Sequence, residues 1–115
     1  MGLEMTPSQA LGLWHSVTAE QVRGDARDLT LRQLAILLEV YLVPPPHTVR
    51  GLAATLNVAK PVVTRALDTL GQLGLVDRVR DEFDRRSVIV RRTVDGALYL
   101  EKLGDRVIAN GRKLG

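Results

Sequence analysis

The chain has 115 residues, which fits one folded domain, because two domains of half that length would each be too small to bury a good core. Apolar residues make up 45% and charged residues 25%, close to the average of soluble globular proteins, which argues against a disordered chain. The absence of cysteine excludes disulfides, thiol nucleophiles and zinc–cysteine sites. Because the sequence also shows no nucleophile–base pair, phosphate-binding glycine loop or metal cluster, we expect a protein that is not an enzyme and that needs no cofactor or metal.

The charge is mildly basic and unevenly distributed along the chain. There are 16 Lys and Arg against 13 Asp and Glu, for a net charge of +3. Residues 1–59 carry four basic and five acidic side chains, whereas residues 60–115 carry twelve basic and eight acidic ones. The excess is almost all arginine, which favours bidentate contacts to phosphate or guanine. Aromatic residues make up only 3% of the chain, too few for a base-stacking platform, so a nucleic-acid partner is expected to be a duplex.

Nothing in the sequence indicates a membrane or an export signal. No run of about 18 apolar residues is present, so we expect no membrane-spanning helix. The stretch Met1–Met5 lacks a basic leader followed by an apolar core, which argues against a secretory signal. The expected location is therefore the cytoplasm.

Helical periodicity predicts two helices in the first part of the chain. The first begins with Thr6 as its N-cap and Pro7 at the first helical position, and it fades near Gly24. The second opens at Thr30, whose hydroxyl can form a capping box with Gln33. This second helix is apolar nearly all round, so we expect it in the centre of the core. The first helix has one apolar face, made up of Ala10, Leu13, Trp14 and Val17.

Two further helices follow a proline run. Pro44-Pro45-Pro46 cannot be helical, and we interpret it as a plain connector because it is short for a ligand of SH3-like modules. Thr48 caps a short helix, and the next helix begins at Lys60-Pro61, where proline is acceptable in the first turn. The stripe of this last helix that we expect to be buried consists of Val63, Ala66, Leu67 and Leu70.

The pattern changes to strands after residue 74. Residues 75–80 alternate as in a strand, the β-branched run 88–90 predicts a second strand, and the polar stretch 81–86 predicts a long charged hairpin loop. A last helix begins near Val94. It carries a stripe with coiled-coil-like spacing, formed by Leu100, Leu103, Val107 and Leu114. Asn110 lies at the next d position, so the stripe is either core padding or a helix-pair interface, and the pattern leaves both open.

The order of these elements is that of a winged helix-turn-helix. Two short helices joined by a tight turn precede a basic hairpin, so we predict a mainly α (α+β) fold with a two- to three-stranded antiparallel wing. We expect one domain over residues 1–115. Within it, residues 1–29 form an N-terminal helix and connector, residues 30–93 a DNA-binding core with its wing, and residues 94–115 a C-terminal helix.

The helix that begins at Lys60 has an outer face suited to the major groove of DNA. Arg65 can fork to a guanine or a phosphate, and Thr64 can bond to a phosphate or a base edge. Pro61 and Val62 can contact thymine methyl groups. The plain alternative is a solvated helix face, but the complete order of elements favours contact with DNA.

The hairpin is the most basic part of the chain. Residues 78–92 hold six arginines against three acids. An arginine at a loop tip suits the narrow, strongly negative minor groove, and Asp84 is suited to orient a neighbouring arginine and fix the loop. The arginines can also be a solvated hairpin surface. The acids of the loop do not have the spacing of a calcium-binding loop.

Several stretches share the pattern of one known family. Residues 84–86 read Asp-Arg-Arg, an apolar strand follows, and residues 93–96 read Thr-Val-Asp-Gly. The other matching stretches are Thr30–Leu34, Val49–Ala53, Val63–Leu70 and Gly74–Val76. With these motifs the chain resembles the MarR-type bacterial transcriptional regulators from about Leu29 to Leu103. Members usually run longer and end in an additional long helix, so the resemblance is to a short form of the family.

The resemblance implies a dimer that binds a palindromic operator and represses transcription. By this resemblance, the contact positions of the recognition helix are occupied by Pro61, Val62, Thr64 and Arg65. Arg86 falls on the minor-groove arginine of the wing, and Asp84 falls on the acid that braces it. Lys60 and Arg85 are expected to contact phosphates. No small-molecule effector is identified by the sequence.

The predicted function is that of a sequence-specific, double-stranded-DNA-binding transcriptional regulator, a repressor that forms a homodimer. We expect the helix over residues 60–70 to contact bases in the major groove and the arginine wing to contact the minor groove. The alternative is a winged-helix adaptor that binds proteins in a regulatory pathway without binding DNA. Retention of duplex DNA at low salt distinguishes the two.

Overall fold

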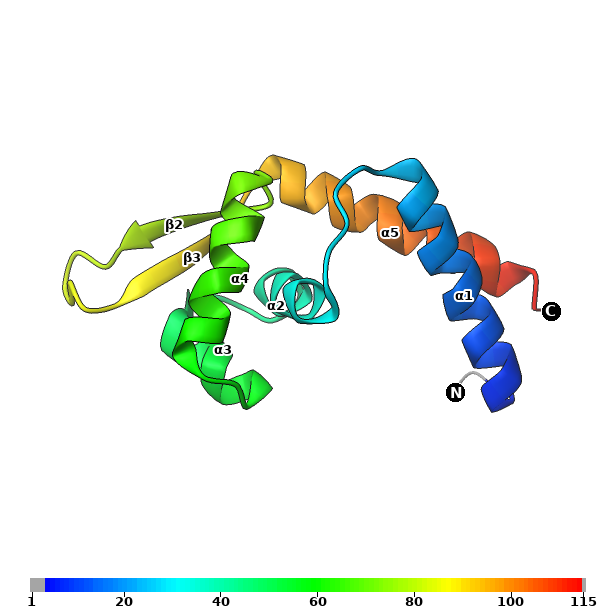
Figure 1. Cartoon of the computed structure of the whole chain (residues 1–115), viewed down its shortest axis with the longest axis horizontal. Helices are drawn as coiled ribbons and strands as arrows, with labels where there is room; N and C mark the ends of the chain where they lie inside the picture. Colours follow the sequence, from blue (N-terminus) through cyan, green and yellow to red (C-terminus); the bar gives the residue numbers. More distant parts are fainter. Residues whose placement is uncertain (1–3, 115) are drawn as a thin grey trace. The chain divides into compact units, whose positions relative to one another are not determined.

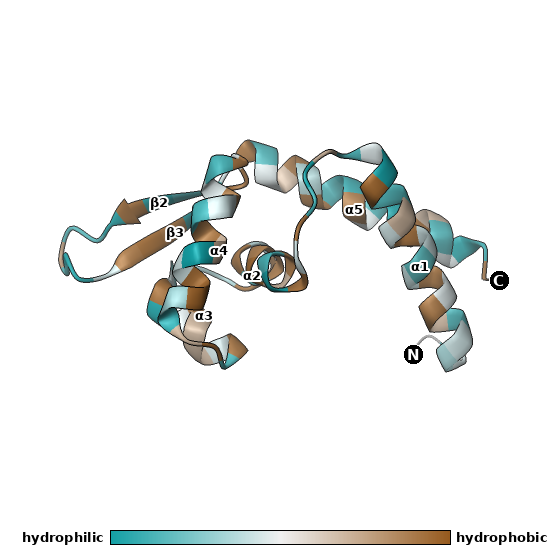
Figure 2. Cartoon of the chain, viewed as in Figure 1, coloured by the Kyte–Doolittle hydropathy of each residue, from teal (hydrophilic) through white to brown (hydrophobic). Residues whose placement is uncertain are grey.

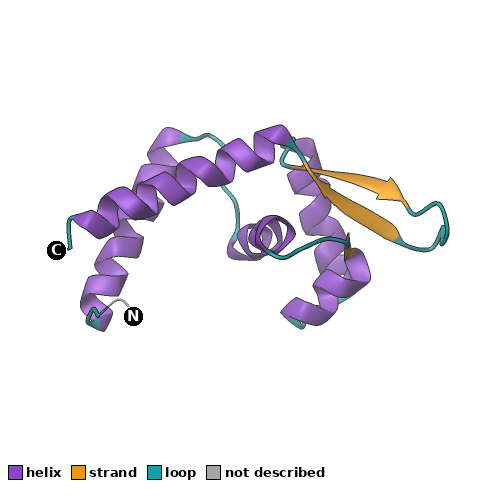
Figure 3. Ribbon diagram, turned by 180° about the vertical axis from the view of Figure 1, so that it is seen from behind, coloured by secondary structure: helices purple, strands orange, loops and turns teal. Residues whose placement is uncertain are grey.

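The computed structural model describes residues 4–114, which form two compact units (Figure 1). One unit is Leu29–Tyr99, and the other combines the described residues before position 29 with those after position 99. The fold is mainly helical with a small antiparallel sheet, as predicted (Figure 3). The elements are α1 (Pro7–Gly24), α2 (Leu31–Leu42), β1 (His47–Thr48), α3 (Val49–Leu56), α4 (Lys60–Gln72), β2 (Val76–Arg80), β3 (Val88–Arg92) and α5 (Val94–Arg112). Among the described residues, no helix is both long and apolar enough to cross a membrane.

Local capping starts the first two helices where the sequence predicts. At α1, the Gln9 amide donates to the Thr6 hydroxyl at 3.1 Å while the Gln9 side chain accepts from the Thr6 amide at 2.8 Å. At α2, Thr30 and Gln33 make the same reciprocal pair at 3.1 and 2.9 Å. Each box satisfies two backbone donors that the first turn leaves open, so both predicted starts are confirmed.

The core of Leu29–Tyr99 is built around α2. In Figure 2 the ribbon of this helix carries hydrophobic colour beside a few hydrophilic positions. Ile36, Leu37 and Val40 are buried, which confirms its predicted central place. α4 packs against α2. All members of the predicted α4 stripe are buried, namely Val63, Ala66, Leu67 and Leu70. Because this stripe holds one side of α4 to the core, the opposite side is left to solvent.

A short turn joins α3 to α4 and completes the helix-turn-helix. Thr48 caps α3 by accepting from the Gly51 amide at 3.0 Å. Asn57 ends α3 in a left-handed conformation (φ 54°), which asparagine adopts more readily than most residues. The chain therefore reverses quickly enough for α4 to begin at Lys60, as the sequence predicts.

The sheet has the strand order β1-β3-β2, and every pairing is antiparallel. β2 and β3 form the predicted hairpin, with Val79 opposite Ile89. β1 adds a third strand by pairing His47 with Val90, at a place where the sequence analysis expected only a connector and a helix cap. A two-residue strand is too short to show an alternating pattern, so it can be recognised only from its pairing with β3 in the structure.

In the other unit, α1 lies beside the C-terminal part of α5 (Figure 1). The side-chain amide of Asn110 is buried and donates to both carboxylate oxygens of Glu20, at 3.1 and 3.0 Å. The polar d position of the stripe is therefore satisfied by a helix of the same chain. Val17 is fully buried, whereas Trp14 on the same face of α1 is 44% exposed.

Candidate nucleic-acid interface

The outer face of α4 is open to solvent. Of the residues predicted to contact DNA from this helix, Val62 is half-buried and the others are exposed, namely Lys60, Pro61, Thr64 and Arg65. Within the described part of the chain, the side chains of Lys60, Thr64 and Arg65 make no hydrogen bond or ion pair. Ala59 at the N-cap makes no side-chain hydrogen bond, so the first turn of α4 has no side-chain cap. The face is thus free to contact a ligand.

A shallow hollow joins this face to the start of α2. It measures about 210 Å³ and is lined by Thr30, Arg32, Gln33, Val62, Arg65, Ala66 and Thr69. Arg32 and Arg65 therefore border the same hollow from two helices. This proximity cannot be predicted from the sequence, because nothing in the local pattern relates residue 32 to residue 65.

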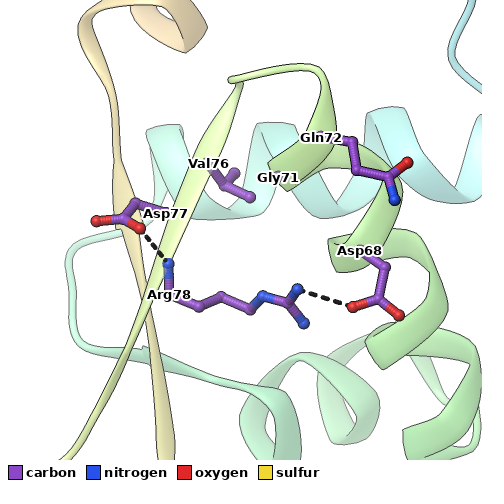
Figure 4. Close-up of a pocket in the computed structure, with 6 residues that line it drawn as sticks. All are labelled: Asp68, Gly71, Gln72, Val76, Asp77 and Arg78. Carbon is purple, nitrogen blue, oxygen red and sulfur yellow. Dashed lines mark hydrogen bonds and ion pairs between the residues drawn. The ribbon is translucent and has the colours of Figure 1, made fainter.

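At the base of the hairpin, two arginines are held by carboxylates. Figure 4 shows Arg78 reaching from β2 to Asp68 on α4, where the ion pair measures 2.7 Å. Asp68 is exposed on α4, and its carboxylate ties that helix to the wing. Arg91 pairs with Asp77 across the two strands at 2.9 Å. This hydrogen bond is the main reason why the pKa of Asp77 is lowered below 3.8, and the Arg78 amide assists.

A third basal arginine is held by backbone carbonyls. The Nε of Arg92 donates to the Val40 carbonyl at 2.9 Å, and its Nη2 donates to the Val43 carbonyl at 3.1 Å. The guanidinium also lies over the ring of Tyr41, 5.9 Å from its centroid, within the range of a cation–π contact. Arg92 therefore joins β3 to the end of α2, and the protein itself uses the Nε donor and one Nη2 donor of its guanidinium.

The tip of the hairpin is braced through its backbone. Asp84 accepts from the Arg86 amide at 3.0 Å and from the Ser87 hydroxyl at 3.3 Å. Arg80 donates to the Arg85 carbonyl at 2.7 Å. The guanidinium groups of Arg85 and Arg86 are exposed and make no hydrogen bond or ion pair within the described residues. Asp84 thus contacts Arg86 through its main chain, and both tip guanidiniums are free.

The junction between the hairpin and α5 explains the Thr-x-x-Gly motif. The Tyr41 hydroxyl donates to the Leu75 carbonyl at 2.8 Å and accepts from the Thr93 amide at 2.9 Å. Thr93 in turn caps α5 by accepting from the Gly96 amide at 2.9 Å, and it donates to the Gly74 carbonyl at 2.8 Å. A Cβ at Gly96 would overlap the Tyr41 hydroxyl and the Leu75 carbonyl oxygen. Only glycine therefore fits, and the motif fixes the ends of both strands.

Comparisons with known proteins agree with this architecture. A family model described as the MarR family matches residues 18–87. The organic hydroperoxide resistance transcriptional regulator of Bacillus subtilis (strain 168) is 40% identical over 58 residues, which are 50% of this chain and 40% of that protein. The match therefore spans less than half the length of this relative.

Solved structures resemble most of the chain. A transcriptional regulator from Thermotoga maritima is 26% identical with a TM-score of 0.75, over 91% of this chain and 71% of that one. A mutant MarR from E. coli complexed with operator DNA is 25% identical with a TM-score of 0.69, over 87% of this chain and 69% of that one. With the family model covering most of the helix-turn-helix and the wing, and with this winged fold, the chain belongs to the MarR family.

Proposed function

We propose that the protein is a sequence-specific, duplex-DNA-binding transcriptional regulator that acts as a repressor. One observation carries the proposal. The basic side chains on the outer face of α4 and at the hairpin tip are exposed and unpaired within the described residues, whereas the arginines at the base of the hairpin are engaged by the protein itself. Groups that a protein leaves free of its own carboxylates are available to phosphates and base edges.

In the major groove, α4 supplies the base contacts. Arg65 offers a planar fork for guanine or phosphate, and Thr64 offers a hydroxyl one residue earlier. Pro61 and Val62 at the start of the helix offer apolar surface to thymine methyl groups. Lys60, in the uncapped first turn, is suited to a phosphate contact that sets the depth of insertion.

In the minor groove, the hairpin tip supplies Arg86, with Arg85 contacting the backbone beside it. A narrow minor groove concentrates negative potential, which favours an arginine inserted from a loop. Asp84 supports this arrangement because its bonds to the loop hold the main chain of Arg86 in place. Its carboxylate is directed to the protein and adds less repulsion toward phosphate than a free acid.

The assembly that we propose is a homodimer on a two-fold-symmetric operator, because paired half-sites use two copies of one recognition helix. Binding over a promoter would exclude the polymerase and so repress transcription. The proposal places the protein with the chromosome, which in bacteria is the cytoplasm. The hydroperoxide role in the name of the Bacillus subtilis relative is not extended to this chain, because its 115 residues contain no cysteine and offer no thiol to an oxidant.

The test is selection of bound sites from random duplexes, followed by fluorescence anisotropy on the selected duplex at graded salt. We expect selected sites with two-fold symmetry and affinity that falls as salt rises. Arg65→Ala and Arg86→Ala should each weaken binding by about 5- to 100-fold. Arg91→Ala removes the same charge from a guanidinium already paired with Asp77, so we expect a loss of less than about threefold.

Two outcomes contradict the proposal. If no duplex is enriched at low salt, the winged-helix adaptor becomes the better reading of the fold. If Arg86→Ala and Arg91→Ala weaken binding equally, the charge of the hairpin matters but the free tip does not, and the minor-groove role of Arg86 is wrong.

A further inference from the structure

The loop between β2 and β3 carries the most exposed large apolar side chain in the described part of the chain. Phe83, the only phenylalanine in the sequence, is 97% exposed. The other residues of the loop are charged, except Ser87, which is polar, so Phe83 has no apolar neighbour in the loop on which to pack. Single exposed apolar side chains are common on protein surfaces, so exposure alone does not identify a contact. This ring, however, precedes the two exposed tip arginines Arg85 and Arg86 by only two and three residues.

The position of Phe83 is defined by the hydrogen bonds of the loop. Its amide donates to the Asp81 carboxylate at 2.9 Å, and the Asp81 amide donates to the Ser87 carbonyl at 3.0 Å, which closes the loop on itself. Asp84 holds the Arg86 amide on the other side of the tip. The ring is therefore carried by a braced turn, between the end of β2 and the two free guanidiniums.

We propose that Phe83 is an apolar wedge that enters the minor groove beside Arg86, partly unstacks one base step and bends the duplex. The inference rests on the proposed DNA-binding function and adds a residue that neither the recognition helix nor the arginine contacts require. Apolar side chains inserted from the minor groove separate neighbouring base pairs and kink DNA toward the major groove. An exposed ring two and three residues before exposed arginines, on a loop held by hydrogen bonds of its main chain, has the chemistry and the anchoring for this role.

The charges of the loop favour insertion of the Phe83 ring, rather than of an acidic side chain, into the minor groove. Asp81 and Asp84 bind loop amides, and Glu82 is the remaining exposed acid. Phosphates repel Glu82, so the groups that enter the groove are the neutral ring and the arginine. Because flexible pyrimidine–purine steps unstack most easily, the wedge would also give specificity at a base pair that no side chain reads by hydrogen bonds.

The test uses the full chain on its selected duplex, with 2-aminopurine placed in turn at each step under the expected wing position. With the wild type, we expect a severalfold rise in fluorescence at one step of each half-site, together with a bend detected by energy transfer between the duplex ends. Phe83→Ala should abolish both signals and weaken binding by about tenfold. Phe83→Leu, which keeps an apolar wedge, should retain most of each signal. Leu42→Ala, at a residue 75% exposed at the end of α2, is the matched control and should change nothing.

The wedge and the DNA-binding function fail in different ways. If Arg86→Ala weakens binding while Phe83→Ala leaves affinity, bend and fluorescence unchanged, the wedge is wrong and the regulator stands. If Phe83→Ala loses affinity but the wild-type complex shows no unstacked step and no bend, the ring makes an ordinary surface contact and the wedge is again wrong. If no duplex is bound, both proposals fall together, and the exposed ring is a protein contact.

Discussion

The base and the tip of the β2–β3 hairpin use the same residue type in opposite ways. At the base, Arg78 and Arg91 are paired with carboxylates, and Arg92 is bound to two carbonyls at the end of α2. At the tip, Arg85 and Arg86 are exposed, and their guanidiniums have no partner within the described residues. The sequence shows six similar arginines, but the structure separates those that hold the wing in place from those that are available to DNA.

This difference shows how a small domain can hold a projecting β-hairpin that has no hydrophobic core of its own. Two antiparallel strands alone are marginally stable in water, so the hairpin depends on what its base is attached to. Here the attachment consists of the Tyr41 and Thr93 junction, the Arg92 contacts and the Arg78 ion pair to α4. Changes at the base should therefore affect stability, while changes at the tip should affect binding alone.

The largest effect is expected from Gly96→Ala. The added Cβ overlaps the Tyr41 hydroxyl and the Leu75 carbonyl, so the junction must shift, and we expect the free energy of unfolding to fall by about 3 kcal/mol in a urea titration. Gly71→Ala in α4 is the control, since no heavy atom lies within 4 Å of its added Cβ. Removing that helix glycine should raise stability by about 0.5–1 kcal/mol. Equal effects of the two substitutions would contradict the proposed role of the junction.

Tyr41→Phe should have the next largest effect. It removes a hydroxyl that bonds to the Leu75 carbonyl and to both the amide and the carbonyl of Thr93. The Thr93 carbonyl keeps the Ala97 amide as a donor, but the Thr93 amide and the Leu75 carbonyl lose the hydroxyl in a half-buried place, so we expect a loss of about 2 kcal/mol. Hydrogen exchange of the Thr93 amide should also accelerate. A variant with unchanged stability would show that water replaces the hydroxyl without cost.

A third prediction compares one arginine from each end of the hairpin. Arg92→Ala removes two hydrogen bonds to carbonyls and a contact with the Tyr41 ring, so we expect unfolding free energy to fall by about 1 kcal/mol. Arg86→Ala removes an exposed group without a partner, so we expect a change within about 0.5 kcal/mol. The distinction between base and tip is wrong if Arg86→Ala destabilises the protein as much as Arg92→Ala does.

The smallest effect is expected at the exposed pair of Asp77 and Arg91. Arg91 lowers the pKa of Asp77 below 3.8, so the pair stabilises the fold above that value, and the contribution is lost as the pH falls through the lower pKa of the folded state. Both side chains are more than half exposed, at 54% and 56%, so solvent screens the pair. Asp77→Asn should therefore lower the urea midpoint slightly at pH 7, and the difference should vanish as the pH falls through the lowered pKa of Asp77 in the folded state. A difference that persists in acid would assign the effect to something other than the ion pair.

Much of the fold could be predicted from residues close together in the sequence. The capping boxes at Thr6 and Thr30 each lie within four residues, and the stripe on α4 repeats with the helical period. The hairpin could be predicted because residues 75–80 alternate and residues 88–90 form a β-branched run. β1 was missed because it has only two residues.

The candidate site was predicted less completely. Exposure of the α4 contact residues followed from helical periodicity, since a helix with one buried stripe must turn its other side to solvent. The state of the arginines at the base of the hairpin did not follow, because their partners are more distant in sequence: Arg92 bonds to Val40 across 52 positions. The place of Arg32 beside Arg65 was hidden for the same reason.

The amino-acid sequence by itself determined the order of the elements, their starts and the family pattern, because caps, periodicity and turn residues act over a few positions. Only the tertiary structure decided which arginines hold the wing in place. It also decided that position 96 must be glycine and that the side-chain amide of Asn110 donates to Glu20. Those features depend on side chains that meet across the fold, and no local pattern records which carboxylate, carbonyl or hydroxyl a long side chain will reach.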